Sequence, residues 1–309
     1  MVANAGSNDV SVIDLQSDKQ LARLEVGANP RGIVFDPQAN RAYVNNVLDG
    51  TISVIDMQAI EVIQSIPITE IPLDPQILLG KQIFNAARVP DLTTDRWVSC
   101  AVCHFDGGMD GRTWLGFPDG PRNTPALFGV GRTLPIHWSG DLDELQDVEG
   151  TFRVIQAGTG LVEGEAHDSL GPPHAGLSEG LDAVAAFMAS LKVPRSPYTI
   201  APNEFKRGEK VFTQTGCTAC HAPPLYTDRQ LHDVGTGDPK LERNSHGRGT
   251  QFDTPSLLGI WATAPYFHDG SAQTLADVLR MGNEHKIADQ ISERELQVLL
   301  SFLRSLPNE

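Results

Sequence analysis

All four cysteines of this chain lie in two copies of one short pattern, C-x-x-C-H, and this pattern limits what the chain can fold around. The first copy is CAVCH, from Cys100 to His104, and the second is CTACH, from Cys217 to His221. Three chemistries use cysteines at this spacing: a tetrahedral zinc site, a redox-active dithiol, and covalent attachment of a haem. Only the third explains why a histidine directly follows the second cysteine in both copies.

We therefore interpret both patterns as attachment sites for a c-type haem. In each site the two cysteines form thioethers with the porphyrin, and the adjoining histidine is the proximal iron ligand. One zinc ion shared by the two cysteine pairs is the alternative, whereas a thioredoxin-like dithiol needs a βαβ context that the sequence lacks. The residues of the two sites are Cys100, Cys103, His104, Cys217, Cys220 and His221.

The haem motifs belong to a longer internal duplication. The segment Thr124–Leu145 aligns without gaps with Thr254–Leu275, and eight positions carry the same residue. Each copy follows a C-x-x-C-H motif and leads to an amphipathic helix before a proline, expected within residues 178–194 and 292–307. The duplication predicts two copies of one mostly helical domain.

The N-terminal segment carries a different repeat. VSVID (Val10–Asp14) recurs as ISVID (Ile52–Asp56), and short alternating runs between turn-forming residues predict β-strands. A period of about 40 residues built from short strands is typical of β-propeller blades, and the stretch AYVNNVLDGTISVID resembles the YVTN family of propeller repeats. Since a closed propeller needs about four or more blades, we expect a propeller fragment. A small sheet packed on the rest of the chain is the alternative.

The expected fold class is therefore mainly α. Two tandem cytochrome c-like haem domains, at residues 71–195 and 196–309, follow a short all-β propeller-repeat segment at residues 1–70. The proline-rich stretch 192–204 joins the two haem domains.

Composition excludes several classes of function. The formal net charge of −15 argues against binding to nucleic acid or an anionic lipid surface, and no apolar run is long enough for a membrane span. Aromatic residues make up only 6% of the chain, against 29 glycines and 21 prolines, which fits small domains whose cores are filled by porphyrin. Because haem is attached covalently outside the cytoplasm, we expect a periplasmic protein with an export signal upstream of Met1.

From Ile71 to Leu306 the chain resembles the bacterial dihaem cytochrome c peroxidase family, which includes the dihaem enzymes that mature methylamine dehydrogenase. The resemblance is carried by LGKQIF, SCAVCH, GPRNTPAL, HWSGDLDEL, RGEKVFTQTGCTACH and TAPYFHDGSAQTL. It implies two covalently bound haem c groups and reduction of hydrogen peroxide to water at the N-terminal haem. It further implies a small c-type cytochrome or cupredoxin as the electron donor, and a homodimer as the assembly.

The resemblance assigns residues to the C-terminal haem, through which electrons would arrive. His221 is its proximal ligand, and Met281 falls at the family's distal methionine, one residue closer than the usual spacing. Thioether ligation raises the potential of a haem, which suits an electron-accepting site. His285, one helical turn further on, is the rival ligand, and His268 is expected to order the haem surroundings.

In the N-terminal copy the resemblance implies a peroxidatic haem with His104 as proximal ligand. Trp138 matches the family's tryptophan between the haems and would lie on the electron path. Asn123 and the carbonyl groups of Thr263 and Pro265 match the family's interdomain calcium site, and oxygen ligands suit this hard cation. One Ca²⁺ ion is therefore expected beside the two haems.

The loop after the first C-x-x-C-H motif departs from the family pattern. It is shorter, and it contains no histidine where the family has a distal ligand, a position that falls near Leu115. The first iron is therefore expected to be open at rest, or ligated by Met109 or His137. No reductive switch carries over from the family.

The acid–base group for peroxide cleavage is also absent from its family position. When the alignment of the two copies is extended without gaps, Met281 corresponds to Thr151, so the segment around Thr151 is expected over the distal face of the first haem. Glu149 is the nearest carboxylate, and a carboxylate can take a proton from one peroxide oxygen and deliver it to the other. Gln156 and His137 are the alternatives.

The sequence thus predicts a dihaem peroxidase, and two other functions remain open. A dihaem oxidase would act on a protein or organic substrate and use the propeller segment as a docking surface. A plain electron-transfer cytochrome would have two six-coordinate irons. The missing distal histidine favours the oxidase slightly.

Overall fold

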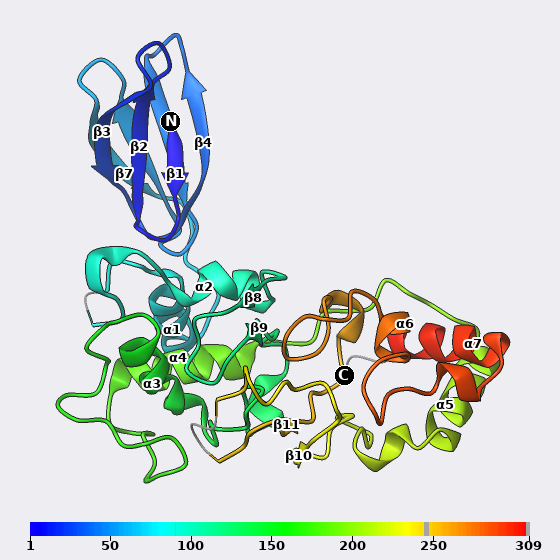
Figure 1. Cartoon of the computed structure of the whole chain (residues 1–309). Coiled ribbons are helices and arrows are strands. Elements are labelled where there is room, and N and C mark those ends of the chain that lie inside the picture. Colours follow the sequence, from blue (N-terminus) through cyan, green and yellow to red (C-terminus); the bar gives the residue numbers. More distant parts are fainter. Residues whose placement is uncertain (90, 244–246, 307–309) are drawn as a thin grey trace. The chain divides into compact units, whose positions relative to one another are not determined.

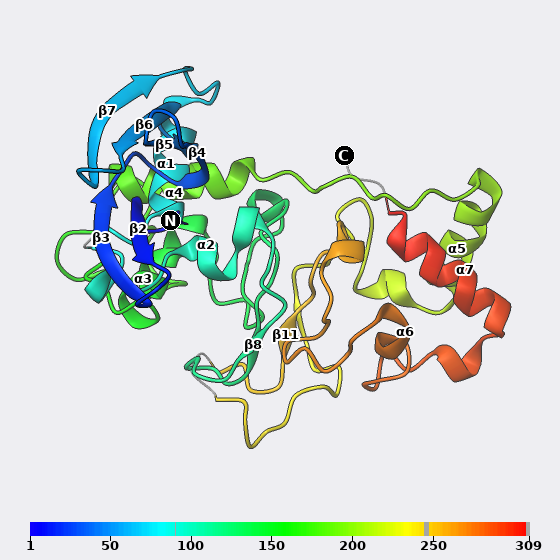
Figure 2. The same cartoon turned by 90° about the horizontal axis from the view of Figure 1, so that it is seen from above.

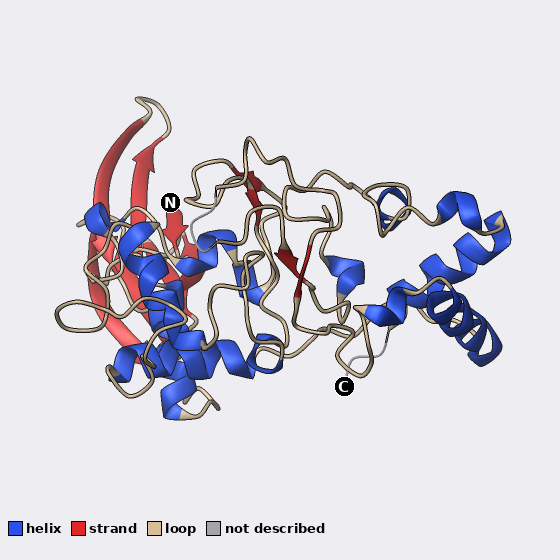
Figure 3. Ribbon diagram, turned by 60° about the horizontal axis from the view of Figure 1, so that its bottom comes forward, coloured by secondary structure: helices blue, strands red, loops and turns tan. Residues whose placement is uncertain are grey.

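Residues 1–89, 91–243 and 247–306 are described by the computed structural model, in which the chain folds as two units. Their elements are drawn along the chain in Figure 1 and by type in Figure 3. The first unit comprises Met1–Val102, Val148–Ala166 and His174–Phe187, and the second comprises Cys103–Asp147, His167–Pro173 and Met188–Glu309.

The N-terminal strands form two antiparallel sheets (Figure 1). One has three strands in the order β1-β2-β3, and the other has four in the order β4-β5-β6-β7. Each strand pairs with its neighbour in the chain, as the predicted tight turns require. The strands are β1 (Val2–Asn4), β2 (Asp9–Asp14), β3 (Lys19–Glu25), β4 (Pro30–Asp36), β5 (Arg41–Asn46), β6 (Thr51–Asp56) and β7 (Glu61–Pro67).

The repeat of VSVID as ISVID is also a repeat of structure. β2 and β6 hold equivalent places in the two sheets, and so do β3 and β7. Asp14 and Asp56 close the same turn after β2 and β6, because each carboxylate accepts the backbone N–H two residues further on, at 3.1 Å from Gln16 and 2.8 Å from Gln58. The predicted repeat is therefore present in the structure, once in a three-stranded sheet and once in a four-stranded sheet.

The two sheets share one small core. It consists of Val10 from β2, Ala42 and Val44 from β5, and Ile55 from β6, all 0% exposed. Ala42 and Val44 are two positions apart, so both point to the same face of their strand. The sheets therefore pack on each other through apolar side chains.

Four helices lie wholly or partly in the first unit: α1 (Pro75–Asn85), α2 (Cys100–Cys103), α3 (Val148–Val154) and α4 (Glu179–Ser190). Asp74 caps α1 by accepting a hydrogen bond from the Gln76 amide at 2.9 Å. Gly80 lets α1 approach α4 closely, since a Cβ at this position would lie 1.8 Å from the Ala183 carbonyl oxygen. A glycine in LGKQIF is thus required by helix packing.

The second unit contains α5 (Pro202–Gln214), α6 (Leu275–Val278) and α7 (Glu293–Arg304). α5 and α7 pack against each other (Figure 2), and Gly208 of α5 again permits the contact, since a Cβ there would lie 2.3 Å from Cβ of Phe302. Ser292 and Glu295 form the predicted capping box at the start of α7. The predicted C-terminal amphipathic helix is therefore confirmed.

The longer duplication appears as two matched loop structures in the second unit. One contains the hairpin of β8 (Thr113–Trp114) and β9 (Arg122–Asn123), and the other contains the hairpin of β10 (Leu231–His232) and β11 (Phe252–Asp253). Gly129 and Gly259 have φ values of 75° and 76°, in the left-handed region that favours glycine. The sequence identities therefore mark a shared backbone path.

The two copies contact each other through a pair of equivalent backbone hydrogen bonds. The backbone N–H of Asn123 donates to the carbonyl of His268 at 2.5 Å, and the N–H of Asp253 donates to the carbonyl of Trp138 at 2.8 Å. Asn123 and Asp253 are equivalent in the alignment of the two copies, and so are Trp138 and His268. The backbone contacts between the two copies are thus reciprocal.

The expected mainly α class is not confirmed, because helices account for only 28% of the chain. The haem motifs are followed by long segments rich in glycine and proline, which fold as turns and short 3₁₀ segments such as Val130–Arg132 and Ile260–Ala262. No helix among the described residues is long and apolar enough to cross a membrane.

Candidate haem sites

The first attachment motif is a single helical turn. α2 spans Cys100–Cys103, and both cysteines are reduced thiols. Burial raises the pKa of the Cys100 thiol to about 11, although the Gln156 amide lies 3.5 Å from its sulfur. The motif therefore places two thiols one helical turn apart, which is the spacing used for thioether attachment of a haem.

The histidine of each motif is half-buried, and its surroundings favour the neutral imidazole. Burial lowers the pKa of His104 and of His221 to about 4, and nearby backbone groups offset this only in part. An imidazole must be neutral to bind a metal through its lone pair. The Nδ1–H of His221 donates to the carbonyl of Tyr226 at 3.0 Å, which leaves Nε2 as the ligand atom.

The second attachment motif begins in the 3₁₀ segment Cys217–Ala219, where Gly216 has a φ of 84°. The backbone N–H of His221 donates to the carbonyl of Cys217 at 2.8 Å, so the motif closes one turn. Burial raises the pKa of Cys217 and of Cys220, and both are reduced thiols. The two motifs thus present the same donor set, two thiols and a neutral imidazole.

Apolar side chains next to the first motif are exposed. Val102 inside it is 53% exposed, Phe105 directly after it is 60% exposed, and Leu115 further along the loop is 78% exposed. A porphyrin attached to the neighbouring cysteines would offer apolar surface to such side chains. These residues and the two half-buried histidines fit covalently bound haem. That the family's distal position falls near Leu115 stays a prediction.

Trp138 and Asn123 lie together where the two copies meet. The indole Nε1–H of Trp138 donates to the Asn123 carbonyl at 2.8 Å. The side-chain amide of Asn123 contacts the carbonyls of Pro265 at 2.6 Å and Phe267 at 3.3 Å, while its Oδ1 is buried and has no partner. The hydroxyl of Thr263 donates to Ile260 at 3.2 Å. Two of the three predicted calcium ligands therefore lie side by side.

A buried charge network next to Trp138 was missed from the sequence. Glu242 accepts from Arg122 Nη1 at 2.6 Å, and its other oxygen lies 2.9 Å from His268 Nε2. The ring of Phe252 stacks on His268 with centroids 3.9 Å apart. All four residues are at most 8% exposed. Arg122 stands in the GPRNTPAL motif, but no local pattern marks Glu242, which lies far from its partner along the chain.

Glu149 has a full set of partners. Its carboxylate accepts from Arg153 Nε at 2.8 Å, from the backbone N–H of Leu161 at 2.8 Å and from that of Val162 at 3.2 Å. It is 0% exposed. These bonds fasten α3 to the segment that follows it, which is a structural task besides the predicted proton transfer.

The other predicted residues are placed differently. Gln156 is buried, contacts Cys100 through Nε2 and keeps Oε1 without a partner. His137 is largely exposed and lies 3.1 Å from Asp141, yet its charge contributes to lowering the pKa of His104. Met109 and Met281 are half-buried. His285 lies opposite His221, with ring centroids 6.3 Å apart.

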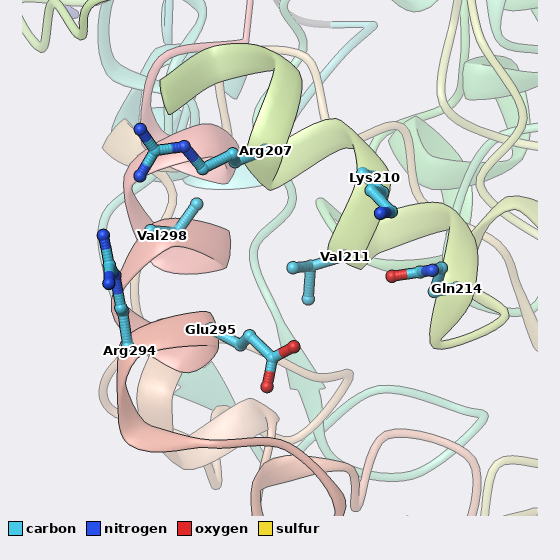
Figure 4. A pocket seen from close by; sticks show the side chains of 7 residues that line it. All are labelled: Arg207, Lys210, Val211, Gln214, Arg294, Glu295 and Val298. Atoms are coloured by element: carbon cyan, nitrogen blue, oxygen red, sulfur yellow. The ribbon is translucent and has the colours of Figure 1, made fainter. Parts of the chain in front are cut away.

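An open groove of about 240 Å³ lies between α5 and α7 (Figure 4). None of the predicted site residues lines it, and three of its lining side chains are cationic. The lining residues are Arg207, Lys210, Val211, Gln214, Arg294, Glu295 and Val298.

Asp253 allows a test of pH dependence. Burial raises the pKa of its carboxyl to about 8, from 3.8 for an ordinary aspartate, and Asp228 adds to the shift. The neutral carboxyl therefore makes its full contribution to the stability of the folded protein below about pH 4. This contribution is lost as the pH rises toward 8 and the carboxyl ionises. We expect Asp253→Asn, which installs the residue found at the equivalent Asn123, to raise the melting temperature more at pH 8 than at pH 4.

The matched control is Asp233→Asn. Asp233 is exposed, and its hydrogen bond from Thr250 lowers its pKa, so this variant should not gain stability as the pH rises. Equal melting-temperature differences for Asp253→Asn at both pH values would contradict the assignment of a buried neutral carboxyl.

Known proteins match most of the chain at modest identity. Residues 251–286 match the family described as RoxA-like, cytochrome c-like. Hydrazine synthase subunit gamma from Kuenenia stuttgartiensis is 29% identical over 262 residues, which covers 67% of this chain and 72% of that protein. The methylamine utilization protein MauG from Methylorubrum extorquens is 27% identical, covering 77% of this chain and 80% of MauG.

A cytochrome c551 peroxidase from Pseudomonas aeruginosa is 26% identical, covering 74% of this chain and 77% of the peroxidase. Among solved structures, hydrazine synthase from Kuenenia stuttgartiensis matches with a TM-score of 0.56 at 26% identity, covering 77% of this chain and 90% of that one. With its two C-x-x-C-H motifs, each ending in a half-buried histidine, the chain is a relative of the dihaem cytochrome c peroxidases and MauG proteins, and it is a cytochrome c peroxidase-like oxidoreductase.

Proposed function

We propose that this protein reduces hydrogen peroxide to water with electrons from a small c-type cytochrome or cupredoxin. The observation that carries the proposal is the pair of attachment motifs, each with two cysteines and a half-buried histidine whose surroundings favour the neutral imidazole. The relatives named as cytochrome c peroxidases support it. The bound haems supply one-electron redox chemistry, and the iron held by His104 is the proposed place of peroxide cleavage.

Residues of the protein are proposed to hold the two irons and to lie on the path of the electrons. His104 and His221 hold the irons as neutral imidazoles, and the bond from His221 to Tyr226 fixes the orientation of its ring. Trp138 is proposed to lie on the electron path, since its ring is fixed by its bond to Asn123 at the contact between the two copies.

Three side chains are candidates for handling the peroxide protons. Gln156 has an unpartnered oxygen next to the Cys100 attachment point, and His137 is close enough to affect His104. Glu149 stays the carboxylate candidate, but its three bonds must loosen before it can exchange a proton. Of the three, Gln156 is therefore the best candidate, because no existing bond to its oxygen has to break.

We further propose a calcium site at Asn123, with the carbonyls of Thr263 and Pro265. Rotating the Asn123 amide by half a turn would place its oxygen 2.6 Å from the Pro265 carbonyl oxygen, a contact that only a shared cation makes favourable. We expect a chelator to lower the stability of the holoprotein by about 2.7 kcal/mol relative to free Ca²⁺ at about 100 times its Kd. Thermal melts with and without Ca²⁺ measure this difference.

The control for the calcium site is Asn123→Ala, which keeps the backbone bond to His268 but loses the side-chain oxygen. Its melting temperature should not respond to Ca²⁺. A response equal to that of the unaltered protein would place the ion elsewhere.

The remaining proposals concern setting and assembly. Relatives of the cytochrome c peroxidase type support a periplasmic location, and a homodimer stays a prediction. We also propose that residues 1–70 are a propeller fragment, because the meander β4-β5-β6-β7 has the four antiparallel strands of one blade.

The second candidate function is oxidation of a protein or organic substrate. The observation that favours it is the loop after the first motif, where an exposed Leu115 replaces the family's distal histidine, and it is consistent with the relationship to MauG. A function in electron transfer alone would require protein ligands to make both irons six-coordinate.

One titration separates these functions. Peroxide is added to the oxidised and to the half-reduced holoprotein while the haem absorption bands are followed, and a reduced c-type cytochrome is then offered. Catalytic cytochrome oxidation is the expected result. Rapid reaction with peroxide without cytochrome turnover would instead support the oxidase, and no reaction with peroxide would leave electron transfer.

A further inference from the structure

His285 lies in a loop that the fold holds firmly. The loop follows α6 and closes on itself, because the backbone N–H groups of Ile287 and Ala288 both donate to the carbonyl of Leu279, at 3.1 and 3.0 Å. Leu279 and Ile287 are 5% and 6% exposed and belong to the main core of the second unit. His285, two residues before Ile287, therefore has a defined position.

The ring of His285 faces the proximal histidine of the second haem site. The ring centroids of His221 and His285 are 6.3 Å apart, and the ring planes are inclined by 51°. Phe267 packs edge-on against His285 with centroids 5.5 Å apart. An imidazole nitrogen bonds a metal at roughly 2.0 Å, so two imidazoles on opposite sides of one metal have centroids about 6 Å apart. The observed spacing matches that arrangement.

The chemistry of the two rings agrees with their spacing. Nδ1 of His285 is buried and has no hydrogen-bond partner among the described residues. The unpartnered nitrogen leaves the imidazole of His285 available as a metal ligand. His221 uses Nδ1 for its bond to Tyr226, which leaves Nε2 for a metal.

We propose that His285, and not Met281, is the second axial ligand of the iron held by His221. The proposal rests on the haem-binding part of the proposed function and does not depend on peroxide as the substrate. Met281 lies one turn earlier, where its backbone N–H closes the end of α6 on Val278 at 3.2 Å. Two histidine ligands give the haem a lower potential than the histidine–methionine pair that the resemblance implies.

The internal duplication allows His285 to be compared with the aligned residue of the first copy. In the same gap-free alignment His285 corresponds to Ile155, whose aliphatic side chain cannot bind iron. In this extension of the alignment, the position proposed to close the second iron carries no metal-binding side chain in the first copy. The C-terminal haem is then confined to electron transfer, and an external molecule such as peroxide can bind only in the N-terminal copy.

The test uses the full-length holoprotein with two covalent haems, verified by pyridine haemochrome and by mass. Absorption, electron paramagnetic resonance and near-infrared magnetic circular dichroism spectra are recorded for the oxidised form. We expect a low-spin signal of bis-imidazole type and no charge-transfer band of thioether-bound ferric haem. A thioether band that disappears in Met281→Leu would overturn the proposal.

Two variants locate the ligand. His285→Ala should convert one low-spin haem to high spin, with recovery on addition of imidazole, and His285→Met should shift the reduction potential of that haem upward. Met281→Leu should leave all spectra unchanged. A low-spin spectrum of His285→Ala equal to that of the unaltered protein would overturn the proposal. If neither His285 variant folds, the spectra of the unaltered protein and of Met281→Leu still decide the question.

The ligand assignment and the peroxidase function can fail separately. A bis-imidazole spectrum in a protein that shows no cytochrome oxidation by peroxide upholds the ligand and refutes the function. Peroxidase turnover with a thioether-ligated haem does the reverse. A holoprotein without haem on Cys217 and Cys220 would overturn the ligand assignment.

Discussion

The double variant Cys217→Ser and Cys220→Ser is expected to carry one covalent haem per chain where the unaltered protein carries two. No other cysteine is available for the second haem, because the remaining pair lies in the first motif. Intact-protein mass and pyridine haemochrome measure the haem content. Loss of the second haem should also abolish cytochrome oxidation, because the donor's electrons would have no route to the first iron.

The reciprocal variant Cys100→Ser and Cys103→Ser is the matched control. It should likewise retain one covalent haem, now on the second motif, and should lose reaction with peroxide. Circular dichroism checks that both variants keep their secondary structure. Full retention of two covalent haems in either variant, or one zinc ion and no haem in the unaltered protein, would refute the interpretation of the motifs.

The variant Glu149→Gln is expected to lower the free energy of unfolding by about 3 kcal/mol, because it removes the charge from a buried ion pair and leaves Arg153 without its partner. The Arg153 side chain is only 26% exposed and that of Glu149 is 0% exposed. Urea denaturation of the holoprotein, followed by circular dichroism, measures the change.

Glu163→Gln is the control, because Glu163 is an exposed acid in the segment that Glu149 fastens, and it should change stability by less than about 0.5 kcal/mol. The rate of peroxide cleavage is measured in the same samples. Unchanged stability together with slow cleavage would contradict the structural role and favour the proton-transfer role predicted from the sequence.

Features encoded in short stretches of sequence were predictable. The two C-x-x-C-H motifs, the capping box at Ser292, and both internal repeats depend on residues close together in the chain or on a regular offset. Such signals are readable because the local chemistry, a thiol pair beside an imidazole or a hydroxyl three residues before a carboxylate, is complete within a few positions.

Features that depend on long-range contacts were not predictable. Glu242 meets Arg122 and His268 only after the two copies fold against each other. The three partners of Glu149 come from up to 13 residues further along the chain, so the sequence predicted a proton-transfer role for Glu149 but not its structural role. The helix content was overestimated because turns and loops wrapped around a porphyrin have no periodic signature.

The reciprocal bonds between the two copies, from Asn123 to His268 and from Asp253 to Trp138, have the form of an isologous interface, in which two equal subunits use the same surface on each other. A symmetric dimer of single-haem modules would be obliged to carry the same side chain at both places. Covalent fusion removes that obligation. One copy holds a tryptophan where the other holds a histidine bonded to Glu242, so equivalent backbone contacts carry two different side chains.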